Sequence, residues 1–132
     1  MPRCTVMPVL AYPNVQKAAA WLCDAFGFTL RIDIGTHRAQ LNVGDDGAVM
    51  LSELTPGDSC DIGHSVMVRI ADVDGHCKRA KERGARILKP PADHPYGERQ
   101  YNVEDMAGHH WTFSQSIADV DPKDWGGTAG KL

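Results

Sequence analysis

Several features that would identify common classes of protein are missing from this sequence. No run of Lys or Arg is longer than two residues and the formal net charge is -3, so a face that neutralises nucleic-acid phosphates is not expected. The four cysteines form no CxxC pair and no zinc-knuckle spacing. No apolar run is long enough to span a membrane, and the N-terminus has no signal-peptide pattern. We therefore expect a cytoplasmic protein with reduced cysteines, no nucleic-acid partner and no membrane contact.

The residues that are present fit a single globular domain. The chain has 132 residues, of which 42% are hydrophobic and 23% are charged, and this is ordinary usage for a domain of that size. We expect one domain over 1–132, made of a first module (5–55), a linker (56–63), a second module (64–116) and an irregular tail (117–132).

An internal repeat defines the two modules. In each module a strand-like segment is followed by a capping residue, a helical pattern, a glycine and further strands. Asn14 and Asp72 are the expected N-cap residues, and Gly27 and Gly84 stand where a helix ends in a left-handed conformation. After Asn14, apolar residues recur at helical spacing, at Val15, Ala18, Ala19, Leu22 and Phe26.

Four strands are expected in each module. The first strands are expected near 6–12 and 65–70, each ahead of its helix. Behind each helix the pattern of β-favouring runs and turn residues predicts three more, over 29–34, 38–43 and 48–54 in one half and 86–89, 99–103 and 110–115 in the other. The segment from Pro90 to Gly97 is expected to be a loop. The fold class is therefore α+β, with two βαβββ modules.

Two segments carry a resemblance to a known family. One is Met7-Pro8-Val9-Leu10-Ala11-Tyr12 with Asn14-Val15, Ala18-Ala19, Trp21 and Phe26-Gly27-Phe28; the other is Tyr96-Gly97-Glu98-Arg99 with Val103, Asp105, Gly108-His109, Trp111 and Phe113. Together with the repeat, they make the sequence similar to the vicinal oxygen chelate superfamily, near its glyoxalase and bleomycin-resistance branch, over about residues 5 to 116. This resemblance implies paired, cupped mixed sheets with a helix on the outer face of each, and a ligand site inside the cup.

The resemblance also allows a test for a metal site. Metal-dependent members place His, Gln or Glu ligands on the first and last strands of both modules. The corresponding positions here fall on Met7, Leu51, Ser65 and Thr112, which are not strong ligands for a divalent metal. We expect no metal and no other cofactor. The alternative is a shift of one residue in strand register that brings a nearby side chain into the cup, at Glu53, His64 or His110.

Strand alternation predicts the residues that line the cup. The two valines and the isoleucine of strand 65–70 suit the helix-covered face, which leaves Met67 and Arg69 for the cup. In strand 110–115 the Trp and Phe form the core pair, which leaves His110 and Thr112 inward. The resemblance places the face that carries Arg99 and Tyr101 inward. The predicted ligand-binding residues are therefore Glu53, Met67, Arg69, Arg99, Tyr101, His110 and Thr112.

Such a lining suits a small organic molecule with an anionic end, because Arg binds carboxylates and phosphates through paired hydrogen bonds. We expect a metal-free binding protein, of the kind that sequesters a drug. The alternative is a superfamily enzyme (a lyase, isomerase or dioxygenase) with an atypical or absent metal site, in which Glu53 or His110 performs acid–base chemistry. A regulatory module with a filled cup is a third reading. The resemblance further implies a homodimer.

Overall fold

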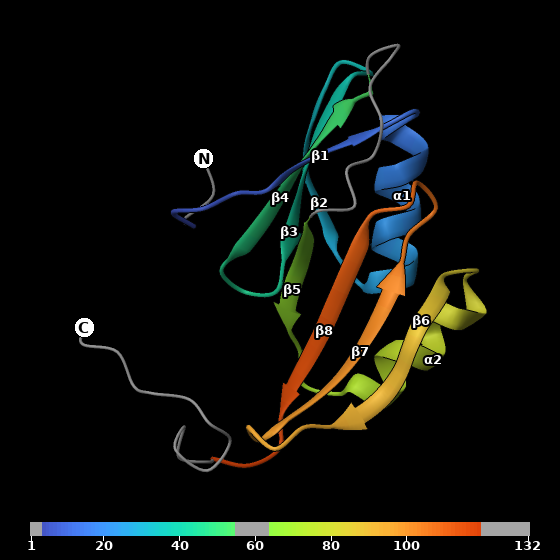
Figure 1. The fold of residues 1–132 in the computed structure, drawn as a ribbon. Helices are drawn as coiled ribbons and strands as arrows, with labels where there is room; N and C mark the ends of the chain where they lie inside the picture. Colours follow the sequence, from blue (N-terminus) through green and yellow to red (C-terminus); the bar gives the residue numbers. More distant parts are fainter. Residues whose placement is uncertain (1–3, 55–63, 120–132) are drawn as a thin grey trace.

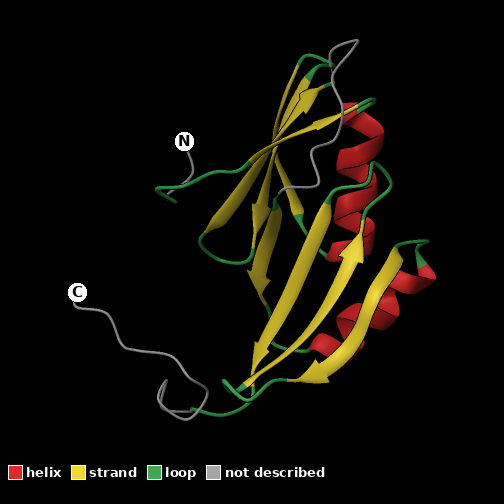
Figure 2. Cartoon of the chain, viewed as in Figure 1, coloured by secondary structure: helices red, strands yellow, loops and turns green. Residues whose placement is uncertain are grey.

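A computed structural model describes residues 4–54 and 64–119 of the chain, and Figures 1 and 2 show their arrangement. The predicted linker and most of the predicted tail, including Trp125, lie outside the described residues. The elements, in chain order, are β1 (Val9–Tyr12), α1 (Val15–Phe26), β2 (Thr29–Ile34), β3 (Arg38–Val43), β4 (Gly47–Glu53), β5 (Ser65–Arg69), α2 (Val73–Glu82), β6 (Arg86–Asp93), β7 (Glu98–Glu104) and β8 (His110–Ser116).

Both helices begin at the residues that the sequence predicts. The side chain of Asn14 accepts a hydrogen bond from the backbone N–H of Lys17 at 3.0 Å, and that of Asp72 accepts one from Gly75 at 3.1 Å. These bonds satisfy backbone donors that have no partner inside the first turn. Gly27 ends α1 with a left-handed φ of 78°, a conformation that glycine adopts without steric cost.

The strands form two four-stranded sheets of the same topology. The order is β1-β4-β3-β2 in the first sheet and β5-β8-β7-β6 in the second. In each sheet the first strand pairs in parallel with the last strand, and the other pairs are antiparallel. The predicted α+β fold of two βαβββ modules with mixed sheets is therefore confirmed. In Figure 2 both helices lie on the same side of the molecule.

One predicted loop is wrong. Pro90 and Pro91 lie inside β6, which continues to Asp93, so the loop shortens to 94–97. β6 is the edge strand of the second sheet, and its pairing with β7 shifts register on both sides of Lys89. An edge strand with such irregularities accommodates proline, because the missing N–H need not face a partner strand.

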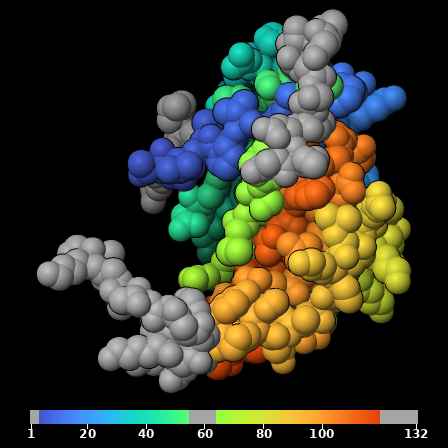
Figure 3. Space-filling view, viewed as in Figure 1, coloured from blue at the N-terminus to red at the C-terminus, as the bar shows by residue number. Residues whose placement is uncertain are grey.

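The hydrophobic core lies on the helix-covered faces of both sheets. In the second sheet Trp111 and Phe113 are fully buried. The ring of Phe26, at the end of α1, packs against both at centroid distances of 5.6 and 4.9 Å. A residue of the first module thus fills the core of the second. Figure 3 shows the two modules, blue to cyan and green to orange, packed directly against each other.

A buried carboxylate also joins the modules. Asp105 is only 5% exposed and lies in the turn between β7 and β8. It accepts hydrogen bonds from the Tyr12 hydroxyl at 2.6 Å, from the Trp111 indole at 3.0 Å, and from the backbone N–H groups of Ala107 and His109. A buried charge requires such partners, because burial removes its hydration. Asp105 therefore connects β1 of the first module to β8 of the second.

A partly buried histidine, His76, occupies the junction of the two helices. The Nδ1 atom of His76 hydrogen-bonds with the Tyr101 hydroxyl, and its Nε2 atom with the carbonyl oxygen of Phe26 at 3.0 Å. Burial lowers the pKa of His76, and the charge of Arg79 adds to this effect, while the Phe26 carbonyl opposes it. The folded protein therefore favours neutral His76.

This lowered pKa predicts a pH dependence of stability. In the unfolded chain His76 has the ordinary histidine pKa near 6.5. Between pH 6.5 and the lower pKa of the folded protein, the unfolded chain therefore binds more protons than the folded protein does. The contribution of neutral His76 should be complete above about pH 6.5 and decrease as the pH falls through the folded pKa. The free energy of unfolding, measured by urea denaturation between pH 8 and pH 5, should show this decrease. In His76→Gln that part of the pH dependence should disappear, whereas it should persist in His37→Gln at an exposed turn.

Candidate functional site

The second sheet has a polar face on the side away from α2. Cross-strand pairing places its residues in adjacent rows, with Met67 beside Thr112 and Asn102, and Arg69 beside Ser114 and Gln100. A further row aligns Ser65, His110 and Glu104. We call this surface the polar face. Apart from Met67, the apolar residues of the same strands point to the core, and the polar face combines exposed side chains such as Met67 with the buried Thr112 and Ser114.

Hydrogen bonds hold the side chains of the polar face in place. The Tyr96 hydroxyl donates to Gln100 Oε1 at 3.0 Å, and Gln100 Nε2 donates to Ser114 Oγ at 3.0 Å. Ser114 Oγ in turn donates to Glu98 Oε1 at 2.9 Å. In the next row, Asn102 Nδ2 donates to Thr112 Oγ1 at 2.7 Å. The face is therefore a preorganised set of amides and hydroxyls, which still offers its remaining donors and acceptors to a ligand.

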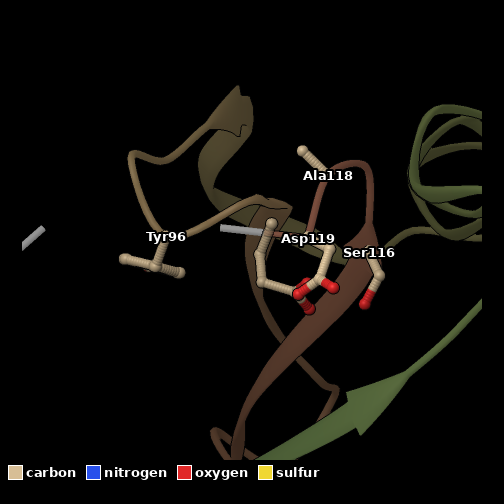
Figure 4. Close-up of a pocket in the computed structure, with 5 residues that line it drawn as sticks. Tyr96, Ser116, Ala118 and Asp119 are labelled. Carbon is tan, nitrogen blue, oxygen red and sulfur yellow. The ribbon is translucent and has the colours of Figure 1, made fainter. Parts of the chain in front are cut away.

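The polar face ends in a pocket of about 470 Å³, lined by Tyr96, Glu98, Ser116, Ala118 and Asp119. Figure 4 shows this pocket, with the Ser116 and Asp119 oxygen atoms at its wall. Hydrogen bonds from Ser116 and Ser114 lower the pKa of Glu98, and the charge of Arg69 adds to this. Glu98 is therefore a carboxylate at neutral pH, and the pocket favours hydrogen-bond donors or cations.

The corresponding face of the first sheet carries large aliphatic side chains, together with Arg38, Gln40, Asn42 and Ser52. One cross-strand row aligns Val9, Met50, Gln40 and Ile32. Val9 is 60% exposed and Ile32 is 44% exposed, which is unusual for large aliphatic side chains. Gln40 accepts a hydrogen bond from Arg31 at 2.9 Å. We call this surface the apolar face. It offers hydrophobic contact where the polar face offers hydrogen bonds.

Four of the predicted site residues lie on the polar face. Met67, Arg69, His110 and Thr112 all point away from the helix-covered core, as strand alternation predicts. Met67 is 63% exposed and Thr112 is 7% exposed. The sequence prediction missed Gln100, Asn102 and Glu98, which belong to the same face: Glu98, Gln100, Asn102 and Glu104 alternate along β7.

The predicted face of Arg99 and Tyr101 is wrong. Arg99 points toward α2, where its guanidinium donates to Asp74 at 3.0 Å and to Asp93 at 2.9 Å. Tyr101 is fully buried and stacks on Phe113 at a centroid distance of 5.4 Å. The physical reason is alternation: Tyr101 pairs with Phe113 across the strands, so both belong to the core. The apolar Val103, two residues after Tyr101, is the sequence signal that could have shown this.

The predicted positions of Leu51 and Glu53 are also wrong. Leu51 is fully buried beside Leu10 on the helix-covered face of the first sheet. Glu53 pairs with Tyr12 on that same face and borders a pocket of about 220 Å³ at the start of α1. The prediction counts four residues from both Gly47 and Gly108, but the residue equivalent to Thr112 is Met50, which lies only three residues after Gly47. A shift of one residue turns a side chain to the opposite face.

Among the described residues, the side chains at the expected ligand positions fit a catalytic metal poorly. With the register corrected, Met50 occupies the place equivalent to Thr112, and neither side chain is a strong ligand for a divalent ion. Within 4–54 and 64–119, no three or more His, Cys, Asp or Glu side chains gather closely enough to hold a metal ion. His64 lies with its ring centroid 6.0 Å from that of His109, while His110 points to the polar face.

The chain has the architecture of a paired-module protein: two βαβββ modules of the same topology, with helices on one side of the sheets. A family model described as the Glyoxalase/Bleomycin resistance protein/Dioxygenase superfamily matches residues 5–113. The chain therefore belongs to this superfamily. Among the described residues, no helix combines the length and apolar character that crossing a membrane requires.

The chain is also similar to several solved structures and curated proteins. The chain is similar to TioX from Micromonospora sp. ML1, with 36% identity over 89% of this chain and 100% of that chain, and a TM-score of 0.71. A superfamily member from Burkholderia phytofirmans PsJN shares the fold at 15% identity, over 83% and 95% of the two chains, with a TM-score of 0.72. An uncharacterised protein of Mycobacterium bovis is 32% identical over 57 residues, which are 43% of this chain and 38% of that protein. This chain thus matches well under half the length of that curated relative.

Proposed function

We propose that the protein binds a small organic molecule at the polar and apolar faces, without a metal ion. The observation that carries this proposal is the chemical difference between the two sheets. One presents Val9, Met50 and Ile32, and the other presents a hydrogen-bonded set of amides and hydroxyls that ends in a pocket. Sites for organic ligands typically combine apolar surface with a few placed polar groups.

The ligand that suits these faces has an apolar body and a polar end with several hydrogen-bonding groups. Amides such as Gln100 and Asn102 both donate and accept, so they match amide, hydroxyl or carbonyl groups of a ligand. Arg69, beside Ser114 in register, would take an anionic group. Sequestration of a drug-like molecule from solution is the use that this arrangement supports best, because binding alone requires no catalytic group.

One experiment tests the metal, the ligand and the assembly together. The protein, purified from its own host without chelator, is analysed by native mass spectrometry and by elemental analysis. We expect a retained organic molecule and well under one transition metal ion per chain. A stoichiometric metal bound through Glu53, His64 or His110 would contradict the metal-free site.

We also propose a symmetric homodimer in the cytoplasm. β2 and β6 are edge strands, and all six residues of β2 are exposed. Exposed edges with apolar side chains are commonly covered by another chain. The same mass spectrum reports the number of subunits, and light scattering at micromolar concentration provides the check. A monomer in both measurements would contradict this proposal.

Two arginine variants distinguish a ligand site on the polar face from one on the helix-covered side of the second sheet. Arg69→Ala should weaken rebinding of the retained molecule about ten- to a hundredfold, the effect of losing one charge-assisted hydrogen bond. Arg99→Ala removes the same group, but its guanidinium is held by Asp74 and Asp93 on the other side of the sheet. Its affinity should therefore equal that of the wild type. Isothermal titration calorimetry measures both, and a loss confined to Arg99→Ala would show that the site is on the helix side.

A further inference from the structure

A groove on the outer side of the molecule lies apart from the polar and apolar faces. It runs between the first turns of α1 and the turn that joins β7 to β8, which lie side by side in Figure 1. The groove has a volume of about 280 Å³ and is lined by Tyr12, Pro13, Asn14, Lys17, Ala18, Trp21, Met106 and Ala107. Its walls therefore come from both modules.

Hydrogen bonds fix the two walls of this groove. The indole of Trp21 donates to the carbonyl oxygen of Arg83 at 2.9 Å and packs edge-on against Phe26. On the other side, Asp105 binds the Tyr12 hydroxyl and the backbone N–H of Ala107, which sets the turn that presents Met106. A ligand would meet a surface already in place, so little conformational entropy would be lost on binding.

The chemistry of the lining indicates the class of ligand. Trp21 and Met106 offer an aromatic face and a thioether, and both make favourable contacts with aromatic rings. Met106 is 49% exposed although it is large and apolar. Among the described residues that line the groove, Lys17 is the one with a charge. We propose that this groove is a second binding site, for a small aromatic carboxylate whose ring lies between Trp21 and Met106 and whose anion pairs with Lys17.

Two probes of equal shape test the proposal: 3-phenylpropionate and its uncharged amide. Each is titrated into the full-length ¹⁵N-labelled protein, and the shifts of the Trp21 indole N–H and the Met106 and Ala107 amides are followed by NMR. The carboxylate should bind about two- to fivefold more tightly than the amide, as expected for one solvent-exposed ion pair. This preference should shrink as salt is added.

Substitutions test which residues cause the preference for the carboxylate over the amide. Lys17→Gln should remove the preference for the carboxylate, whereas Lys81→Gln, at an exposed position of α2, should keep it. Met106→Glu, also at an exposed position, should weaken the carboxylate more than the amide through like charge. The proposal is overturned if neither probe shifts these signals up to its solubility limit, if the two probes bind equally, or if the shifts fall on Gln100, Asn102 and Thr112 instead. Unchanged melting temperatures show that the variants remain folded.

Discussion

Replacing Asp105 with Ala should reduce the free energy of unfolding by about 3–5 kcal/mol. The carboxylate accepts four hydrogen bonds, two from the side chains of Tyr12 and Trp111 and two from backbone N–H groups. Ala leaves Tyr12 and Trp111, both fully or almost fully buried, without this partner. Each buried donor left unsatisfied costs about 1–3 kcal/mol, which sets the size of the effect. Urea denaturation followed by far-UV circular dichroism measures it.

The matched control is Asp46→Ala, because Asp46 is an exposed carboxylate in the turn before β4. Its replacement should change stability by no more than about 0.5 kcal/mol. Tyr12→Phe removes one donor to Asp105 and keeps the ring, so it should have an intermediate effect. If Asp105→Ala were as stable as Asp46→Ala, the carboxylate would not connect the modules in solution.

Trp111→Ala should cost about 3–5 kcal/mol of stability, as large-to-small replacements of buried aromatic residues do. The indole is fully buried and contacts Phe26 and Phe28 of the first module and Phe113 of its own strand. The replacement leaves a cavity on the helix-covered face and also removes a hydrogen bond to Asp105. Thermal and urea denaturation should both show the loss.

Met67→Ala provides the contrast, since Met67 belongs to the same sheet and points the other way. It is 63% exposed, so its replacement should change stability by about 0.5 kcal/mol at most while reducing apolar contact with a ligand. A Trp111→Ala protein that kept wild-type stability but lost its ligand would reverse the assignment of the two faces of the second sheet.

Most of the fold could be predicted from the sequence because its determinants are local. Asn14 and Asp72 cap the helices through side chains that lie three residues from the N–H groups they bind. Gly27 ends α1 through its own backbone freedom. The extension of β6 through Pro90 and Pro91 could not be predicted in this way, because it depends on which strand lies at the edge of the sheet.

Only some of the side chains expected to line the site lie on the expected face of their sheet, for a physical reason. Met67 and Thr112 were placed correctly because their strands alternate clearly between apolar and polar residues. Arg99 lies on the opposite face from the one expected, which the alternation of Tyr101 and Val103 with it along the strand indicates, whereas its partners, Asp74 and Asp93, lie 25 and 6 residues away in the sequence. Leu51 and Glu53 were misplaced by a difference of one residue between the two halves, to which the face of a strand is fully sensitive.

Core residues and polar-face residues alternate along β7 and β8, and this alternation affects which substitutions the protein can tolerate over generations. Neighbouring residues such as Tyr101 and Asn102, or Phe113 and Thr112, face opposite sides of the sheet, and only one of each pair belongs to the core. Substitutions at the exposed positions of the polar face, such as Met67 and Arg69, can therefore accumulate without a large loss of stability, whereas those on the other side are removed by selection against unfolding. Lineages that inherit this scaffold are free to acquire new ligands one alternate residue at a time, which is one physical route by which a single fold comes to serve unrelated chemistries.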